Sequence, residues 1–85
     1  MTYRIQIEKS ALKQLSKLEK QIREKTTAMI NTLADDPRPF GYKKLVDEGG
    51  TCRVKVGDYR ILDDIFDKVL IVNVIGIAQR SERTY

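Results

Sequence analysis

The chain has 85 residues, 41% of them hydrophobic and 33% charged, which predicts one small folded domain over residues 1–85 and excludes a disordered tail. Sixteen Lys and Arg against twelve Asp and Glu give a net charge of +4, which attracts polyanions without identifying any one of them. With a single cysteine, Cys52, and no histidine, an internal disulfide and a His/Cys metal site are excluded.

We therefore expect a protein without a cofactor, whose chemistry comes from Lys, Arg, Tyr and carboxylates. Its first residues lack the apolar core of a signal peptide, and no run of the chain is apolar enough for a membrane span. The unpaired cysteine fits a reducing compartment, where it is a small apolar strand residue. The expected location is the cytoplasm.

The elements of the first half are a strand and two helices. Residues 3–8 alternate apolar and polar side chains, as a half-buried strand does. Ser10 follows as a candidate helix N-cap. Apolar residues then recur at helical spacing over residues 11–18 and again over residues 22–33, which predicts two amphipathic helices packed as an antiparallel pair.

Beyond the second helix the pattern becomes β-rich. Pro37 and Pro39 end the helix, and a loop is expected up to about Gly50. Three strand-like runs follow and predict a meander: Cys52–Val56, Tyr59–Phe66 and Val69–Ile77. The order of elements predicts an α+β fold, β-αα-βββ, with a helical hairpin on one face of a small, mostly antiparallel sheet. The other face of the sheet stays open.

The turn between the first two strands of the meander determines which residues pair. Gly57-Asp58 has the Gly-X form of a two-residue type II′ turn. It places Lys55 directly opposite Arg60 on the open face, with Arg53 two residues along the strand. The opposite, buried face receives Val54, Val56, Tyr59 and Ile61.

This arrangement of cations does not favour folding, because like charges directly opposite one another across strands are destabilising. Lys55 and Arg60 therefore indicate a face that binds an anion. The alternative is a solvated basic face whose long side chains splay apart.

Two residues near the C-terminus, Arg80 and Tyr85, are further candidates for this face. A regular last strand would place Arg80 on the core face, so its membership requires a bulge or a strand end near Gly76–Ala78. The alternative for Tyr85 is a terminal residue without a role.

The chain contains C-R-V-K-V, G-D-Y-R and V-I-G-I-A-Q-R-S-E-R-T-Y in this order, preceded by S-A-L-K-Q-L-S-K-L and D-D-P-R-P. With these motifs, nearly the whole chain resembles the RelE branch of the RelE/ParE toxin superfamily. It implies a ribosome-dependent endoribonuclease that cleaves mRNA in the ribosomal A site. It also implies a RelB-like protein antitoxin as partner, and a free toxin that is monomeric.

The resemblance further assigns site residues. The two strand cations of the family fall on Arg53 and Lys55, the arginine after Gly-x-Tyr on Arg60, the late arginine on Arg80 and the terminal tyrosine on Tyr85. Arg53 replaces what is often a lysine, and the segment before Tyr85 is about one residue shorter than usual. Nucleases of the superfamily that use a histidine differ from this chain, which has none. The resemblance thus implies a metal-independent mechanism that relies on cations.

In such a mechanism the 2′-hydroxyl of RNA attacks the adjacent phosphate. Lys55 is the candidate base, because the charges of Arg53 and Arg60 favour loss of its proton. The two arginines suit the non-bridging phosphate oxygens. By resemblance, Arg80 is the candidate acid or an electrostatic group, and Tyr85 stacks on a base or binds the phosphate.

Two other functions remain open at this stage. The first is a ParE-like inhibitor of DNA gyrase, which has the same fold and usually an arginine at the position of Arg60. The second is a non-catalytic RNA-binding module, whose affinity for RNA would depend steeply on salt.

Overall fold

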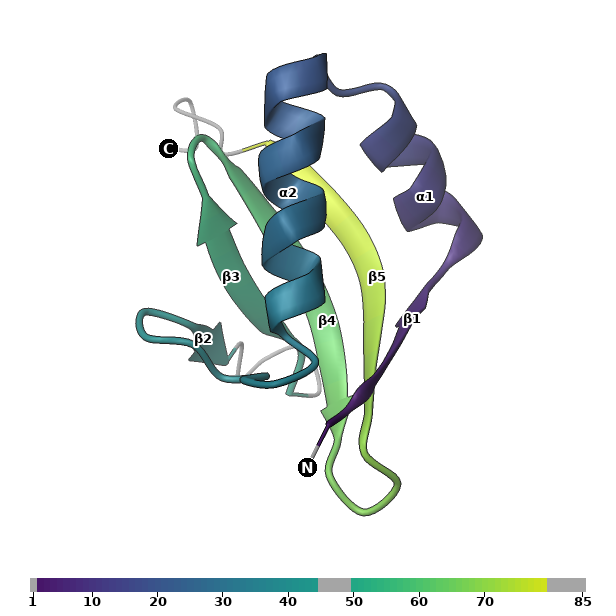
Figure 1. The fold of residues 1–85 in the computed structure, drawn as a ribbon, viewed down its shortest axis with the longest axis vertical. Helices are drawn as coiled ribbons and strands as arrows, with labels where there is room; N and C mark the ends of the chain where they lie inside the picture. Colours follow the sequence, from purple (N-terminus) through teal and green to yellow (C-terminus); the bar gives the residue numbers. More distant parts are fainter. Residues whose placement is uncertain (1, 45–49, 80–85) are drawn as a thin grey trace.

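A computed structural model describes residues 2–44 and 50–79 as a twisted sheet with two helices on one face (Figure 1). In these ranges the elements in chain order are β1 (Arg4–Ile7), α1 (Lys9–Ser16), α2 (Lys20–Thr32), β2 (Lys43–Lys44), β3 (Cys52–Val56), β4 (Tyr59–Phe66) and β5 (Ile71–Gln79). The strand order is β1-β5-β4-β3-β2, with β1 parallel to β5 and the other pairs antiparallel. The predicted fold class is confirmed. Neither helix is long and apolar enough to cross a membrane.

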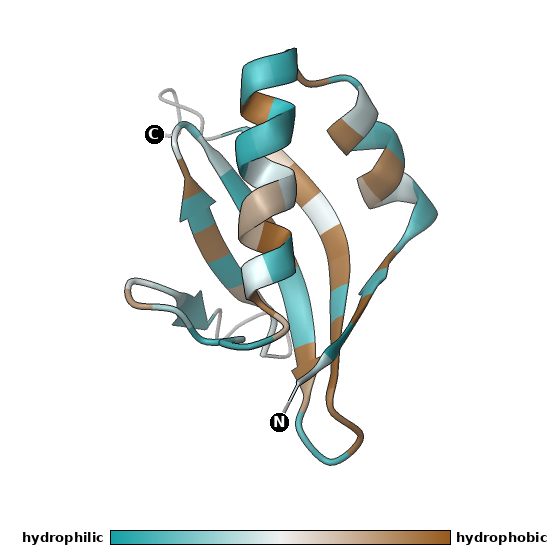
Figure 2. Ribbon diagram, in the orientation of Figure 1, coloured by the Kyte–Doolittle hydropathy of each residue, from teal (hydrophilic) through white to brown (hydrophobic). Residues whose placement is uncertain are grey.

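The hydrophobic core lies between the helices and the sheet. Its least exposed large residues are Ile30, Leu33, Ile61, Val72 and Val74. Figure 2 shows that β3 alternates apolar and polar residues, whereas β5, which lies between β1 and β4, is mostly apolar. The polar positions of β3 are thus left on the face that the helices do not cover.

The predicted N-cap at Ser10 is wrong. Glu8 is the N-cap residue of α1, and Ser10 lies inside the first turn of the helix. The reason is that Glu8, the one residue between β1 and α1, bonds to both the sheet and the helix: its N–H donates to the carbonyl of Val74 at 2.9 Å, and its carbonyl accepts from the N–H of Leu12 at 2.9 Å. The chain therefore passes from strand to helix through a single residue.

The meander is confirmed, and a bulge interrupts it. The register of β4 and β5 shifts between Leu62 and Asp63, which leaves Ile75 as an extra residue in β5. The N–H of Ile77, just beyond the bulge, donates to Oε1 of Gln14 in α1 at 2.8 Å. The predicted break in the last strand thus lies one residue earlier than expected, and a helix side chain satisfies a backbone group next to it.

One residue on the buried face of β4 is a carboxylate. Asp63 is fully buried, pairs with Cys52 across the strands, and neither of its carboxylate oxygens has a hydrogen-bond partner. Burial, and secondarily the charge of Asp64, raises the pKa of Asp63 to about 7. Burial likewise raises the pKa of the Cys52 thiol, which fits the predicted structural role of that residue.

A surface cluster ties the start of the chain to two loops. Asp67, in the turn between β4 and β5, accepts two hydrogen bonds from the guanidinium of Arg38, at 2.8 and 3.2 Å, and one from the hydroxyl of Tyr3 at 2.6 Å. These donors lower the pKa of Asp67. The loop between α2 and β2 is therefore held at Arg38.

Candidate functional site

The hairpin of β3 and β4 has the predicted register. Gly57 has φ +59, and the pairs above the turn include Lys55 with Arg60 and Arg53 with Leu62. On the other face Val54, Val56 and Ile61 are buried and Tyr59 is half-buried, whereas on the open face Lys55 is exposed and both arginines are half-buried. The sheet thus holds three cations on its open face, as the turn predicted.

The structure adds Lys43, a fourth cation that was not predicted. It lies in β2, a two-residue edge strand, directly opposite Arg53. The sequence predicted a loop here, because two consecutive lysines show no alternation of apolar and polar residues. To predict Lys43 from the sequence, one would have to know which residues of the segment before Gly50 pair with β3. No short turn motif connects the two segments and fixes that pairing.

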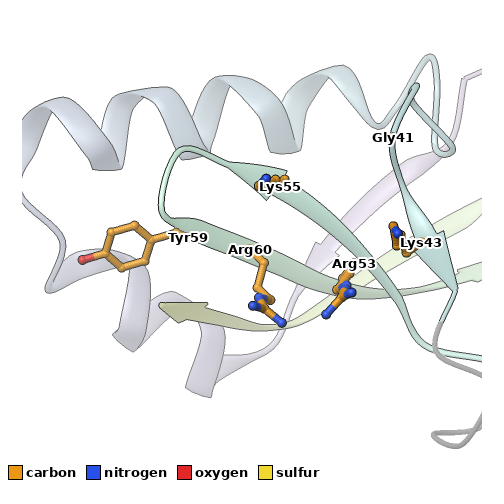
Figure 3. A pocket seen from close by; sticks show the side chains of 6 residues that line it. All are labelled: Gly41, Lys43, Arg53, Lys55, Tyr59 and Arg60. Atoms are coloured by element: carbon orange, nitrogen blue, oxygen red, sulfur yellow. The ribbon is translucent and has the colours of Figure 1, made fainter. Parts of the chain in front are cut away.

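These cations surround a surface pocket of about 260 Å³ (Figure 3). Its lining residues are Gly41, Lys43, Arg53, Lys55, Tyr59 and Arg60. Figure 3 shows the side chains of Arg53 and Arg60 extending from neighbouring strands in the same direction, with Tyr59 pointing away from them. We call Lys43, Arg53, Lys55 and Arg60 the basic face.

No carboxylate lines the pocket, and none of the four cations of the basic face has an ion pair or a side-chain hydrogen bond within the described residues. Arg38 shows the contrast, because its guanidinium is paired with a carboxylate at 2.8 Å. The side-chain N–H groups of the basic face are therefore available to bind a ligand, and the strands determine the spacing between them.

The other sequence-predicted residues are placed as follows. Tyr59 lies on the buried side of the hairpin as expected, packs against the core, and also borders the pocket. Ala78 of β5 pairs with Arg60, and the described part of the strand ends at Gln79. Arg80 and Tyr85 lie outside the described residues.

Chemically, the basic face is suited to bind an anion with several oxygens. Guanidinium groups bind phosphate oxygens through paired N–H donors, and ammonium groups add point charges. Cations two residues apart on one strand are separated by about 6.5–7 Å along it. The basic face can therefore contact more than one phosphate of an extended chain.

A family model described as the ParE toxin of type II toxin–antitoxin system, parDE, matches residues 5–84. A comparison with curated proteins gives no match.

Solved structures of RelE toxins have the same fold. The RelE chain of the archaeal RelE–RelB complex from Pyrococcus horikoshii OT3 is 28% identical, with a TM-score of 0.85 over 96% of this chain and 99% of that one. The RelBE2 toxin–antitoxin complex from Mycobacterium tuberculosis matches at 24% identity and TM-score 0.82, over 94% and 100% of the two chains. The intact E. coli RelBE complex matches at 25% identity and TM-score 0.79, over 95% and 99%.

The fold defines the class first: it is that of a small RelE-type toxin, as the sequence predicted. The match over nearly the whole chain then shows that the protein belongs to the ParE toxin family of type II toxin–antitoxin systems, within the RelE/ParE superfamily.

Proposed function

We propose that this toxin is a ribosome-dependent endoribonuclease that cleaves mRNA in the A site and so inhibits translation. The observation that carries the proposal is the basic face, with four cations, two of them directly opposed across the strands, and no carboxylate among the described residues that line the pocket. Its proposed substrate is the phosphate backbone of the message.

The reaction needs neither water nor a metal ion, because RNA carries its own nucleophile. The 2′-oxygen bonds to the adjacent phosphorus and loses its proton, and the bond from phosphorus to the 5′-oxygen breaks. That oxygen gains a proton and leaves as a hydroxyl, while the other product ends in a 2′,3′-cyclic phosphate. The enzyme must move two protons and stabilise the additional negative charge of the phosphorane.

We assign the base to Lys55, which is exposed and lies opposite Arg60. Arg53 and Arg60, which are half-buried residues, bind the non-bridging oxygens, to which the planar guanidinium group is suited. Arg80 as acid or electrostatic group and Tyr85 as a stacking or phosphate-binding group remain proposals from the resemblance.

The test is cleavage of a translated message by wild-type protein and by Lys55→Ala and Arg60→Ala. We expect each substitution to reduce cleavage by about 100-fold or more, because each removes a group that acts on the phosphate. Lys25→Ala is the matched control, since Lys25 is an exposed cation of α2 on the helical layer. Wild-type cleavage in both site variants would refute the assignment.

A second candidate is a ParE-like inhibitor of DNA gyrase, which is favoured by the ParE description of the matching family. Inhibition of gyrase supercoiling without cleavage of translated mRNA would establish it. Binding of RNA with a steep salt dependence and without cleavage on ribosomes would instead indicate a non-catalytic RNA-binding module.

The proposed partners follow from the reaction and the comparisons. The matched P. horikoshii, M. tuberculosis and E. coli structures are complexes of a toxin with its antitoxin. We propose a RelB-like antitoxin for this chain, cytoplasmic action on ribosomes, and a monomeric free toxin. Co-purification with the product of an adjacent short gene tests the first of these.

A further inference from the structure

The most exposed large apolar side chain of the described residues is Phe40, whose relative exposure of 107% means that it makes almost no contact with the fold. It lies in the loop between α2 and β2. The N–H of Tyr42 donates to the carbonyl of Pro39 at 3.0 Å, and Gly41 has φ +90. This is a β-turn with a left-handed third residue, which places Phe40 at its tip.

The turn is anchored on both sides. Before it, the guanidinium of Arg38 donates two hydrogen bonds to Asp67. After it, Tyr42 packs against the hydrophobic core. The exposure of Phe40 therefore results from a turn fixed at both ends.

Folding does not require an aromatic residue at this position. The turn needs glycine at its third position, whereas its second accepts most residues, including polar ones. Phe40 is absent from the apolar residues that pack on the core. A single exposed apolar side chain is ordinary on a protein surface, so the significance of Phe40 depends on what lies beside its turn.

The turn also borders the basic face. Gly41 lines the same pocket as Arg53, and Lys43, two residues later, lies opposite Arg53 in the sheet. Figure 3 shows Gly41 and Lys43 on one segment that flanks the β3–β4 hairpin. The aromatic ring and the unpaired cations are thus presented by neighbouring residues.

We infer that Phe40 is a stacking platform for a base of the single-stranded RNA whose phosphates contact the basic face. The inference rests on the proposed function for the class of ligand. Single-stranded nucleic acid is bound in this way by proteins that combine a cationic path with exposed aromatic rings. RNA is favoured over a protein segment because its phosphates and its bases would occupy the cations and the aromatic ring together.

The chain has no tryptophan, so Phe40→Trp introduces a single fluorescent reporter. The probes are a 2′-O-methyl RNA hexamer, which cannot be cleaved by its own 2′-oxygen, and inorganic polyphosphate of similar charge. We expect the hexamer to quench the tryptophan by base stacking, and polyphosphate to leave it nearly unchanged. Leu12→Trp is the control, because Leu12 is 49% exposed on α1, which packs against β5. Its fluorescence should respond to neither probe.

Affinity gives a second readout. Phe40→Ala should weaken binding of the labelled hexamer by roughly 10- to 100-fold and leave polyphosphate binding unchanged, whereas Phe40→Tyr should keep wild-type affinity. Equal hexamer affinity in Phe40→Ala and wild type overturns the inference. The inference is also overturned if the hexamer does not bind, or if an antitoxin quenches the Phe40→Trp fluorescence and the hexamer does not.

The outcomes separate this inference from the proposed function. Quenching by the hexamer in a protein that cleaves no translated mRNA refutes the nuclease and supports the stacking platform. Normal mRNA cleavage together with an unresponsive reporter supports the nuclease and overturns the platform.

Discussion

The buried carboxylate of Asp63 makes the stability of this protein depend on pH near neutrality. Asp63 has no hydrogen-bond partner and no exposed surface, and burial raises its pKa from 3.8 to about 7. The folded protein therefore binds the Asp63 proton more tightly than the unfolded chain. The resulting stabilisation is complete below the ordinary pKa of 3.8 and is lost as the pH rises to about 7.

The size of the effect follows from the change in pKa. A change from 3.8 to about 7 corresponds to at most ~4 kcal/mol at ~1.4 kcal/mol for each pH unit. Reorientation of nearby groups and entry of water reduce this value, and we expect about 2 kcal/mol. The nearby charges act in opposite directions, since Asp64 raises the pKa and Arg38 lowers it.

The assay is urea unfolding at several values between about pH 4 and about pH 8, applied to wild type and to Asp63→Asn. The Asn variant cannot ionise, so the difference in unfolding free energy between the two proteins isolates the titration of Asp63. We expect this difference to change by about 2 kcal/mol in favour of the variant as the pH rises. Asp36→Asn, at an exposed position, is the control and should follow the wild-type curve.

Parallel curves for wild type and Asp63→Asn over the whole range would refute the reasoning. They would mean that Asp63 is as well solvated in the folded protein as in the unfolded chain.

Three further predictions concern stability. Lys55→Ala should raise the unfolding free energy by a few tenths of a kcal/mol at low salt, because it removes the like charge opposite Arg60. Urea unfolding at high salt should show no such increase, because salt screens the repulsion. Gln14→Met should lower the unfolding free energy by about 1–2 kcal/mol, because the N–H of Ile77 loses its acceptor. The amide hydrogen of Ile77 should then exchange faster with solvent. Gly57→Ala should lower the unfolding free energy by about 1–2 kcal/mol in urea unfolding, because a φ of +59 is unfavourable for alanine. An added Cβ would meet no other atom, so backbone strain is the whole effect, and an unchanged unfolding free energy would argue against it.

Much of the fold was predictable because it rests on local chemistry. Gly57-Asp58 determines a hairpin register, and the register alone places Lys55 opposite Arg60. The helices and the meander follow from periodicity in the same way. The three cations of the hairpin were therefore found from the sequence.

The remaining features depend on contacts between distant residues. Lys43 joins the basic face only because a two-residue strand pairs with β3, and no pattern within so short a strand predicts that pairing. The bulge at Ile75 depends on packing between β5 and α1. Alternation in β4 places residue 63 on the buried face, although an aspartate is rarely buried there without a partner.

The strand order has a consequence for how the toxin acquires its fold during synthesis. Among the described strands β5 is made last, and it lies between β1 and β4. Until residues 71–79 are available, β1 lacks its neighbour, and the core lacks Val72 and Val74. The contacts that complete the sheet thus join the two ends of the chain, which makes folding a late and non-local event. A chain that lacks residues 71–79 can pair β3 with β4 but cannot close the core beneath them.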